Sequence, residues 1–110
     1  MKLKRVIGLM SGTSLDGIDA ALIETDGDAI ARPLASRSTA YDADFRRALR
    51  SAIAGDLPPA DLEPELTRRH AVAVRALLDA AGFAIDSIDL VAFHGQTVLH
   101  RPEERRTWQI

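Results

Sequence analysis

The chain contains no cysteine among its 110 residues. It can therefore form no disulfide framework, no thiolate zinc site and no cysteine nucleophile. The chain also lacks a large excess of positive or negative charge, with 14 Lys and Arg and 16 Asp and Glu. The charge balance therefore gives no reason to expect a nucleic-acid partner. No apolar run approaches the roughly 18 residues of a membrane-spanning helix, and the basic N-terminus precedes too short an apolar stretch for a secretory signal. We expect a cytoplasmic protein, with no membrane partner, whose chemistry depends on Ser, Thr, Asp, Glu and His.

The hydrophobic fraction of 46% and the charged fraction of 27% are typical of a globular domain. Alternating and continuous apolar patterns predict strands at 5–10, 15–25 and 29–41, with a tight turn at 26–28. Pro33 places the third strand at a sheet edge, because proline cannot donate to a strand ladder.

Two helices should follow these strands. Asp42 is the expected N-cap of the first helix, and Gly55 is expected to end it. Asp61 is the expected N-cap of the second helix, which carries Pro64 in its first turn. A strand at 89–93, a polar loop at 94–97, a charged surface loop at 101–106 and the start of another strand complete the pattern. The fold class is therefore α/β in the order βββααβ, with a further strand beginning at the end.

The first candidate site is the Gly-, Ser- and Thr-rich segment GLMSGTSLDGID at 8–19. A tight turn of such residues between two strands can gather backbone N–H groups into a concavity that binds phosphate oxygens. The hydroxyls of Thr13 and Ser14 could add hydrogen bonds, and Asp16 could hold a metal ion through water. A plain hairpin whose glycines only satisfy turn geometry remains the alternative. No Walker-A lysine follows, and the spacing from Gly12 to Gly17 is one residue too long for a serine-hydrolase elbow built on Ser14.

Asp16 and Asp19 are expected on opposite faces of one strand, because side chains alternate along a strand. At most one of them should then point into a site. Asp16 is nearer the turn and is the single catalytic candidate, with turn capping as its alternative role.

The second candidate site is His94-Gly95-Gln96-Thr97, directly after an apolar strand. Ligands of α/β sheets gather at the carboxyl ends of strands, and these side chains suit a hydroxyl- or amide-bearing ligand. An ordinary exit from a strand is the alternative. His70 lies on the apolar face of the second helix and is expected to be a hydrogen-bonded core residue.

Both candidate segments resemble the signatures of bacterial anhydro-N-acetylmuramic acid kinases. The N-terminal signature corresponds to 8–19, the second to HGQTV at 94–98 followed by HRP at 100–102, and TWQI at 107–110 resembles the strand that follows. The resemblance implies a ribonuclease H-like fold of the actin, Hsp70 and sugar-kinase type, with two lobes closing on ATP. Residues 1–110 would then be the N-terminal part of the first lobe, which we expect to be incomplete.

The resemblance also implies a reaction and its cofactors. Family members use ATP and Mg²⁺ to open the 1,6-anhydro ring of anhydro-N-acetylmuramic acid and phosphorylate its 6-oxygen, in cell-wall recycling. An amino sugar is thus the expected small-molecule substrate. The implied ATP-phosphate loop consists of Gly12, Thr13, Ser14, Leu15, Asp16, Gly17, Ile18 and Asp19. His94, Gln96 and Thr97 would lie near the sugar.

Two further expectations concern what the chain does by itself. Many sugar kinases of the wider superfamily place Asp where this chain has Ser11, so Asp16 is the nearest acidic group for a metal-bound water. The family's general base belongs to a segment after Ile110, so the 110 residues alone should be inactive. The alternative is a non-catalytic nucleotide- or phosphate-binding assembly module built on the same lobe. An unpaired final strand also predicts self-association, for example as a homodimer.

Overall fold

The computed structural model describes residues 2–12, 14–101, 103 and 105–109, and among these the side chains at 94, 97–101 and 106–109 are left undescribed. The elements are, in order, β1 (Lys4–Ser11), β2 (Gly17–Thr25), β3 (Ala31–Ala40), α1 (Ala43–Ala54), the 3-10 helix η1 (Pro59–Leu62), α2 (Glu63–Ala81), the 3-10 helix η2 (Ile85–Ser87), β4 (Leu90–Arg101) and β5 (Arg106–Gln109). The predicted α/β class and the βββααβ order are confirmed.

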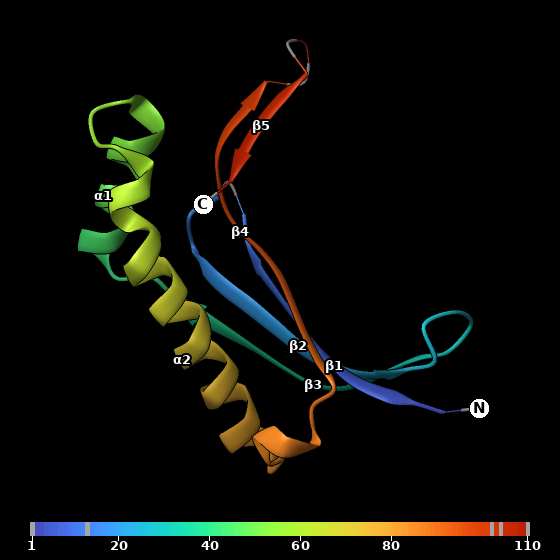
Figure 1. Cartoon of the computed structure of the whole chain (residues 1–110). Coiled ribbons are helices and arrows are strands. Elements are labelled where there is room, and N and C mark those ends of the chain that lie inside the picture. Colours follow the sequence, from blue (N-terminus) through green and yellow to red (C-terminus); the bar gives the residue numbers. More distant parts are fainter. Residues whose placement is uncertain (1, 13, 102, 104, 110) are drawn as a thin grey trace.

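The five strands form one sheet in the order β3-β2-β1-β4-β5. β1, β2 and β3 pair antiparallel, β4 pairs parallel to β1, and β5 pairs antiparallel to β4. The helices provide the crossover that a parallel β1–β4 pair needs, and Figure 1 shows both on the same side of the sheet. β3 lies at the edge that Pro33 predicted.

The core lies between this helix-bearing face and the helices. Alternate residues of β1 and β2 point into it, as the period of a strand requires. The fully or nearly fully buried members from these two strands are Ile7, Leu9, Ile18, Ala20 and Leu22. The opposite face of the sheet carries no helix, and Met10 on it is 56% exposed.

Helix α1 has the predicted cap at each end. The Asp42 carboxylate accepts a hydrogen bond of 2.8 Å from the Phe45 N–H, which satisfies one of the free donors of the first turn. Gly55 adopts φ 88°, and its N–H donates to the Ala52 carbonyl. Helix α2 differs: the predicted Asp61 cap is wrong, because Asp61 lies inside η1 and α2 begins at Glu63 without a side-chain cap. Pro64 does occupy the first turn.

The predicted loop at 94–97 is also wrong, because β4 continues through it to Arg101. Gly95 has φ 74° and lies at a bulge, where the register between β1 and β4 shifts by one residue. Gly95, which the sequence places in a loop, instead lies at the bulge of a continuous strand. Residues after the bulge pair with β5 in a hairpin.

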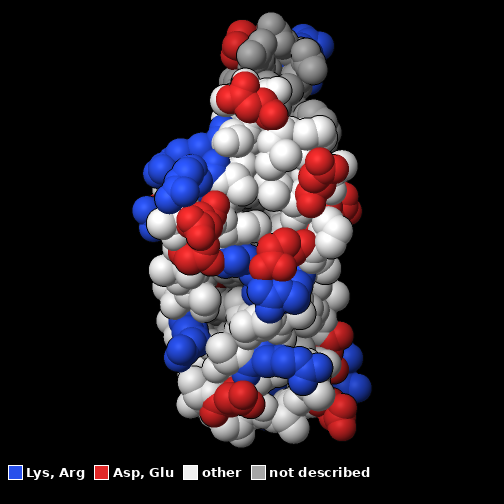
Figure 2. Space-filling view, turned by 90° about the vertical axis from the view of Figure 1, so that its left-hand side faces the viewer, with Lys and Arg blue, Asp and Glu red and all other residues white. Residues whose placement is uncertain are grey.

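The helix-bearing face mixes charges of both signs, as Figure 2 shows. Several oppositely charged pairs are one turn apart along a helix, including Arg47 with Asp44 and Arg68 with Glu65. Within the described ranges, no helix is long and apolar enough to cross a membrane.

Candidate functional site

The turn between β1 and β2 is closed by backbone hydrogen bonds at both ends. The Leu15 N–H donates to the Gly12 carbonyl at 3.2 Å, and the Tyr41 N–H donates to the Asp16 carbonyl at 3.0 Å. Leu15 has φ 61°, a left-handed conformation that is rare for a bulky residue. Its side chain is only 6% exposed, so burial in the core holds this strained residue in place. We call residues 12–16 the β1–β2 turn.

A concavity of about 390 Å³ lies beside this turn. From the turn and β2 it is lined by Gly12, Ser14, Asp16, Gly17, Ile18 and Asp19. The end of β3 supplies a second wall with Ser38, Thr39 and Ala40, and Met10 of β1 completes the lining. We call this concavity the turn cavity. It unites most of the residues that the first motif singled out.

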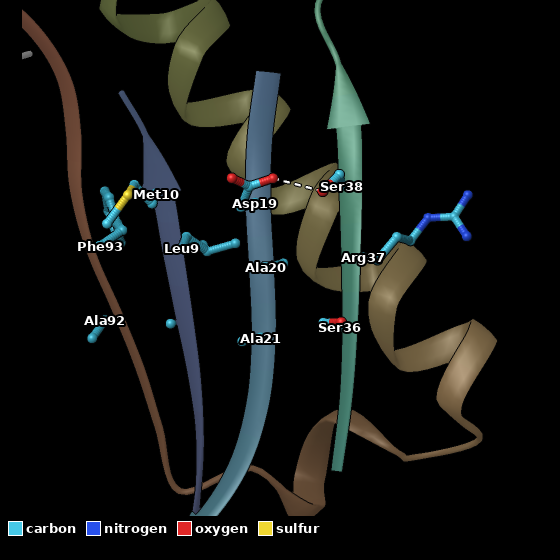
Figure 3. Close-up of a pocket in the computed structure, with 11 residues that line it drawn as sticks. Leu9, Met10, Asp19, Ala20, Ala21, Ser36, Arg37, Ser38, Ala92 and Phe93 are labelled. Atoms are coloured by element: carbon cyan, nitrogen blue, oxygen red, sulfur yellow. Dashed lines mark hydrogen bonds between the residues drawn. The ribbon is translucent and has the colours of Figure 1, made fainter. Parts of the chain in front are cut away.

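The two carboxylates are arranged differently from the prediction. β2 begins at Gly17, so Asp16 belongs to the turn and the alternation of a strand does not apply to it. Asp16 and Asp19 both contribute to the lining of the turn cavity. The premise that both lie on one strand is wrong, because Asp16 precedes β2. Asp19 also accepts a hydrogen bond of 2.6 Å from the Ser38 hydroxyl across the β2–β3 pair, drawn as a dashed line in Figure 3.

Two glycines of the motif serve different purposes. A Cβ on Gly17 would lie 2.1 Å from the Thr39 carbonyl oxygen, so the close approach of β3 requires glycine there. A Cβ on Gly12 would meet nothing within 4 Å, and its φ is not in the left-handed region. The described fold thus gives no steric reason for glycine at 12, whereas a ligand approaching the backbone would.

The lining of the turn cavity favours a phosphate group that arrives with a divalent cation. The cavity contains two carboxylates and hydroxyls, and no Lys or Arg is among its described lining residues. A bare anion would be repelled there, whereas Mg²⁺ commonly binds to one or two carboxylates together with substrate phosphates. In the part of the chain that the structure describes, no three His, Asp or Glu side chains form a metal cage.

The other predicted site residues have varied positions. Leu15 and Ile18 bury their side chains in the core, so only their backbone could contact a ligand. Thr13 lies outside the described residues, as do the side chains of His94 and Thr97, although both of the latter lie in β4. Gln96 is fully buried, and its amide bonds to Ser11 and to the Gly12 carbonyl.

His70 is the core residue that the sequence predicted. It is 4% exposed, and its Nδ1 lies 2.8 Å from the Leu66 carbonyl oxygen. Because a carbonyl can only accept, Nδ1 carries the proton.

Sequence reasoning missed the wall contributed by β3 and the role of Tyr41. A register count along the predicted β2–β3 hairpin, with its turn at 26–28, places 35–37 opposite 17–19, whereas the structure places 38–40 there, so the count alone identifies the end of β3 as the wall but not its residues. No local pattern points to Tyr41, which lies 30 residues from its hydrogen-bond partner Ser11.

A second, larger concavity lies on the sheet face away from the helices. It has a volume of about 770 Å³, and Figure 3 shows its lining residues along the strands, with the helices behind the sheet. Its floor is a row of small residues on four adjacent strands: Ala92, Gly8, Ala21 and Ser36. It shares Met10, Asp19 and Ser38 with the turn cavity but does not include the β1–β2 turn.

Comparison with known proteins agrees with the motifs. The family model described as anhydro-N-acetylmuramic acid kinase matches residues 4–110. Proteins with that name in Rhizorhabdus wittichii and Rhizobium johnstonii are 53% and 49% identical to the chain, over 94% and 98% of its length. One in Paramagnetospirillum magneticum is 46% identical over 94% of the chain. The chain spans about a third of the length of these relatives. The resemblance drawn from the two signatures is confirmed, and the chain belongs to the anhydro-N-acetylmuramic acid kinase family.

Proposed function

We propose that the turn cavity binds the phosphates of Mg²⁺-ATP, and that the chain supplies this part of a kinase acting on anhydro-N-acetylmuramic acid. The observation that carries the proposal is Gly12, a glycine that the described packing does not require, beside a cavity with two carboxylates. Family membership gives the nucleotide and the sugar as the expected ligands.

The sheet topology supports the finer assignment of the fold. An antiparallel β1-β2-β3 meander with β4 parallel to β1 is what the first lobe of a ribonuclease H-like sugar kinase should contain. In that fold the turn between the first two strands faces the cleft where ATP lies. We accordingly propose that residues 1–110 are the N-terminal part of the first kinase lobe.

Within this site the chain's own residues would bind and orient the phosphates. Backbone N–H groups of the β1–β2 turn and the Ser14 hydroxyl can donate to phosphate oxygens. Asp16 and Asp19 can hold water or a cation next to those oxygens. When bound, Mg²⁺ neutralises charge on the transferring phosphoryl group. Such transfer depends on positioning and electrostatic stabilisation, which a backbone-lined turn is suited to provide.

Ring opening needs a base that activates water, and the family places it outside these residues. His94 and Thr97 are proposed to lie near the sugar, because β4 runs beside β1, whose last residue adjoins the β1–β2 turn, and continues beyond the end of β1. The 110 residues would then provide the phosphate cradle, while the base comes from the part of the relatives that the chain does not span.

Titration calorimetry with Mg²⁺-ATP tests the phosphate cradle on the chain itself. A Gly12→Val variant should lose at least about tenfold in affinity, because a β-branched side chain fills the space over the turn. Gly8→Val is the matched control, since a Cβ there also meets nothing within 4 Å but lies on β1. Excess EDTA should weaken binding to the wild-type chain. Equal affinity of wild type and Gly12→Val would refute the cradle.

Turnover tests the division of labour. The 110-residue chain should phosphorylate no anhydro-N-acetylmuramic acid in an assay where the Rhizorhabdus wittichii relative serves as the positive control. Turnover by the chain alone would show that a base lies within residues 1–110. Binding without turnover in a longer protein would favour the assembly module instead.

A further inference from the structure

Buried hydrogen bonds connect Tyr41, just before α1, through Ser11 and Gln96 to the β1–β2 turn. We call these bonds the buried hydrogen-bond chain. Ser11 and Gln96 are both 0% exposed, and Tyr41 is 4% exposed. The Ser11 Oγ lies 2.6 Å from the Tyr41 Oη and 2.5 Å from the Gln96 Oε1. The Gln96 Nε2 lies 2.9 Å from the Gly12 carbonyl oxygen. The last of these bonds joins β4 to the backbone of the proposed phosphate cradle.

The acceptor groups determine which atom donates in each bond of the buried hydrogen-bond chain. The Gly12 carbonyl can only accept, so the Gln96 amide nitrogen donates to it and the amide orientation is set. The Gln96 Oε1 accepts from the Ser11 hydroxyl. Ser11 has then used its one proton, and the Tyr41 hydroxyl must donate to Ser11. All three side chains are therefore engaged in a single consistent arrangement.

The bulge in β4 is what aims Gln96 at this position. Leu9 pairs with Phe93, whereas Ser11, two residues further along β1, pairs with Gln96, three residues further along β4. Without the extra residue, Gln96 would point to the opposite face of the sheet, because a shift of one residue exchanges the faces. Gly95, at φ 74°, permits the bulge.

We propose that Gln96 is a positioning residue, whose hydrogen bond to the Gly12 carbonyl sets the conformation of the β1–β2 turn for phosphate binding. The proposal rests on the proposed function of the turn cavity, and it replaces direct contact of Gln96 with the sugar. The anchored Gly12 carbonyl holds the backbone at the start of the turn, and Gly12, Ser14 and Asp16 of the same turn line the cavity where the phosphates are proposed to bind.

Two other contacts make the turn responsive to this anchor. The same Gly12 carbonyl also accepts from the Leu15 N–H, and Leu15 is held in its left-handed conformation by burial. Loss of the Gln96 bond thus leaves the carbonyl with one weaker partner at 3.2 Å and allows the strained turn to relax. The amides of Ser14, Leu15 and Asp16 are the natural reporters of such a change.

A Gln96→Glu variant tests the anchor through pH. A protonated carboxyl has one O–H and one carbonyl oxygen, and so reproduces the donor and acceptor of the amide. An ionised carboxylate has no proton for the Gly12 carbonyl. Burial raises the pKa of a carboxyl group, so ionisation of Glu introduced at this position should require a higher pH than ionisation of an exposed glutamate. In NMR spectra the turn amides should match wild type at pH 5 and shift at pH 8, with Mg²⁺-ATP affinity falling about tenfold or more relative to wild type at pH 8.

A Gln96→Met variant tests the same anchor without a buried charge, and it serves as the test if the ionised Gln96→Glu variant unfolds at pH 8. It has similar length, cannot donate at any pH, and leaves no buried charge, so the turn amides and the affinity should change equally at both pH values. Thr25→Val is the matched control, because it removes a hydrogen bond to the Ile30 carbonyl at the far end of β2. It should reduce Tm and leave turn and affinity unchanged.

The outcomes separate the two proposals. Turn amides and affinity at wild-type values in folded Gln96→Met would overturn the positioning role. So would an equal loss of affinity in Thr25→Val, which would show a general loosening. A wild-type chain that binds no Mg²⁺-ATP contradicts the proposed function, and the amide shifts then decide by themselves whether Gln96 sets the turn.

Discussion

The Cα of Gly17 lies directly against the backbone of Thr39. A Cβ built on Gly17 would lie 2.1 Å from the Thr39 carbonyl oxygen and 2.8 Å from the Ala40 Cα. Gly17 pairs with Ala40 as the first residue of β2, where the β1–β2 turn enters the sheet. The wall that β3 contributes to the turn cavity can stand this close only because residue 17 has no side chain.

A Gly17→Ala substitution should therefore destabilise the fold by about 2 kcal/mol or more, the range typical of overpacking against an immobile neighbour. Gly8→Ala is the control, since its Cβ meets nothing within 4 Å. It should be neutral or slightly stabilising, because alanine restricts the unfolded chain more than glycine. Urea unfolding measures both. Equal free energies of unfolding would mean that β3 does not approach Gly17 as described.

Leu15 offers a test of the left-handed conformation in the turn. Leu15→Ala should cost about 2–5 kcal/mol, because a buried leucine is lost while φ remains near 61°. Leu15→Gly loses the same contacts but removes a left-handed penalty of about 1 kcal/mol. We expect Leu15→Gly to be at least as stable as Leu15→Ala, the reverse of the usual order in a strand. A glycine variant that unfolds at clearly lower urea than the alanine variant would contradict this conformation.

Acid should weaken the packing of α2 against the start of α1. Arg69 joins the two helices, with its Nη2 2.8 Å from the Asp42 Oδ2 and its Nε 2.9 Å from the Glu65 Oε1. Hydrogen bonds from Arg68 first, and then from Arg69, lower the pKa of Glu65 from 4.5 to about 2. The Phe45 N–H and Arg69 also lower the pKa of Asp42. A depressed pKa contributes stability above the unfolded value, and this contribution is lost as pH falls through the folded value.

In a Glu65→Gln variant the urea midpoint should consequently depend less on pH between about 4.5 and 2 than in wild type. Arg68→Met should flatten the same region, because it removes the largest cause of the shift, and the double variant should add little. Midpoints of Glu65→Gln that fall as steeply as those of wild type would show that the ion pair is not formed in solution.

Much of the scaffold could be predicted from the sequence because its signals are local. The Asp42 cap, the Gly55 end of α1, the edge position of β3 and the buried His70 each follow from a few neighbouring residues. The β1–β2 turn was found in the same way, from its glycines and hydroxyls.

What could not be predicted depends on strand register and on distant partners. A bulge between Leu22 and Ile23 moves β3 by one residue against β2, and so decides which of its residues reach the turn cavity. The bulge at Gly95 likewise decides that Gln96 faces Ser11. A glycine in the sequence is compatible with either a loop or a β-bulge, and only the pairing with the neighbouring strand distinguishes the two. Asp61 does not cap α2, because it lies within η1, which directly precedes that helix.

Tyr41 gives the most direct measurement of the buried hydrogen-bond chain. It is the single tyrosine of the protein, so the absorbance of tyrosinate reports on it alone. Burial raises the pKa of its hydroxyl above 10.0, while the Ser11 hydroxyl and the charge of Arg69 act in the opposite direction. Ser11 can favour the phenolate only by donating to it, and must then give up its bond to Gln96. Ionisation of Tyr41 therefore breaks the buried hydrogen-bond chain that leads to the β1–β2 turn.

The tyrosinate absorbance of the folded chain should thus have its midpoint above pH 10, returning to about 10 in concentrated urea. A pKa that is raised on folding contributes stability below the unfolded value, and this is lost as pH increases through the folded value. The free energy of unfolding should accordingly decrease above pH 10 in wild type and less so in Tyr41→Phe. A folded-state midpoint at or below the midpoint in urea would mean that Tyr41 is open to solvent and donates no buried hydrogen bond to Ser11.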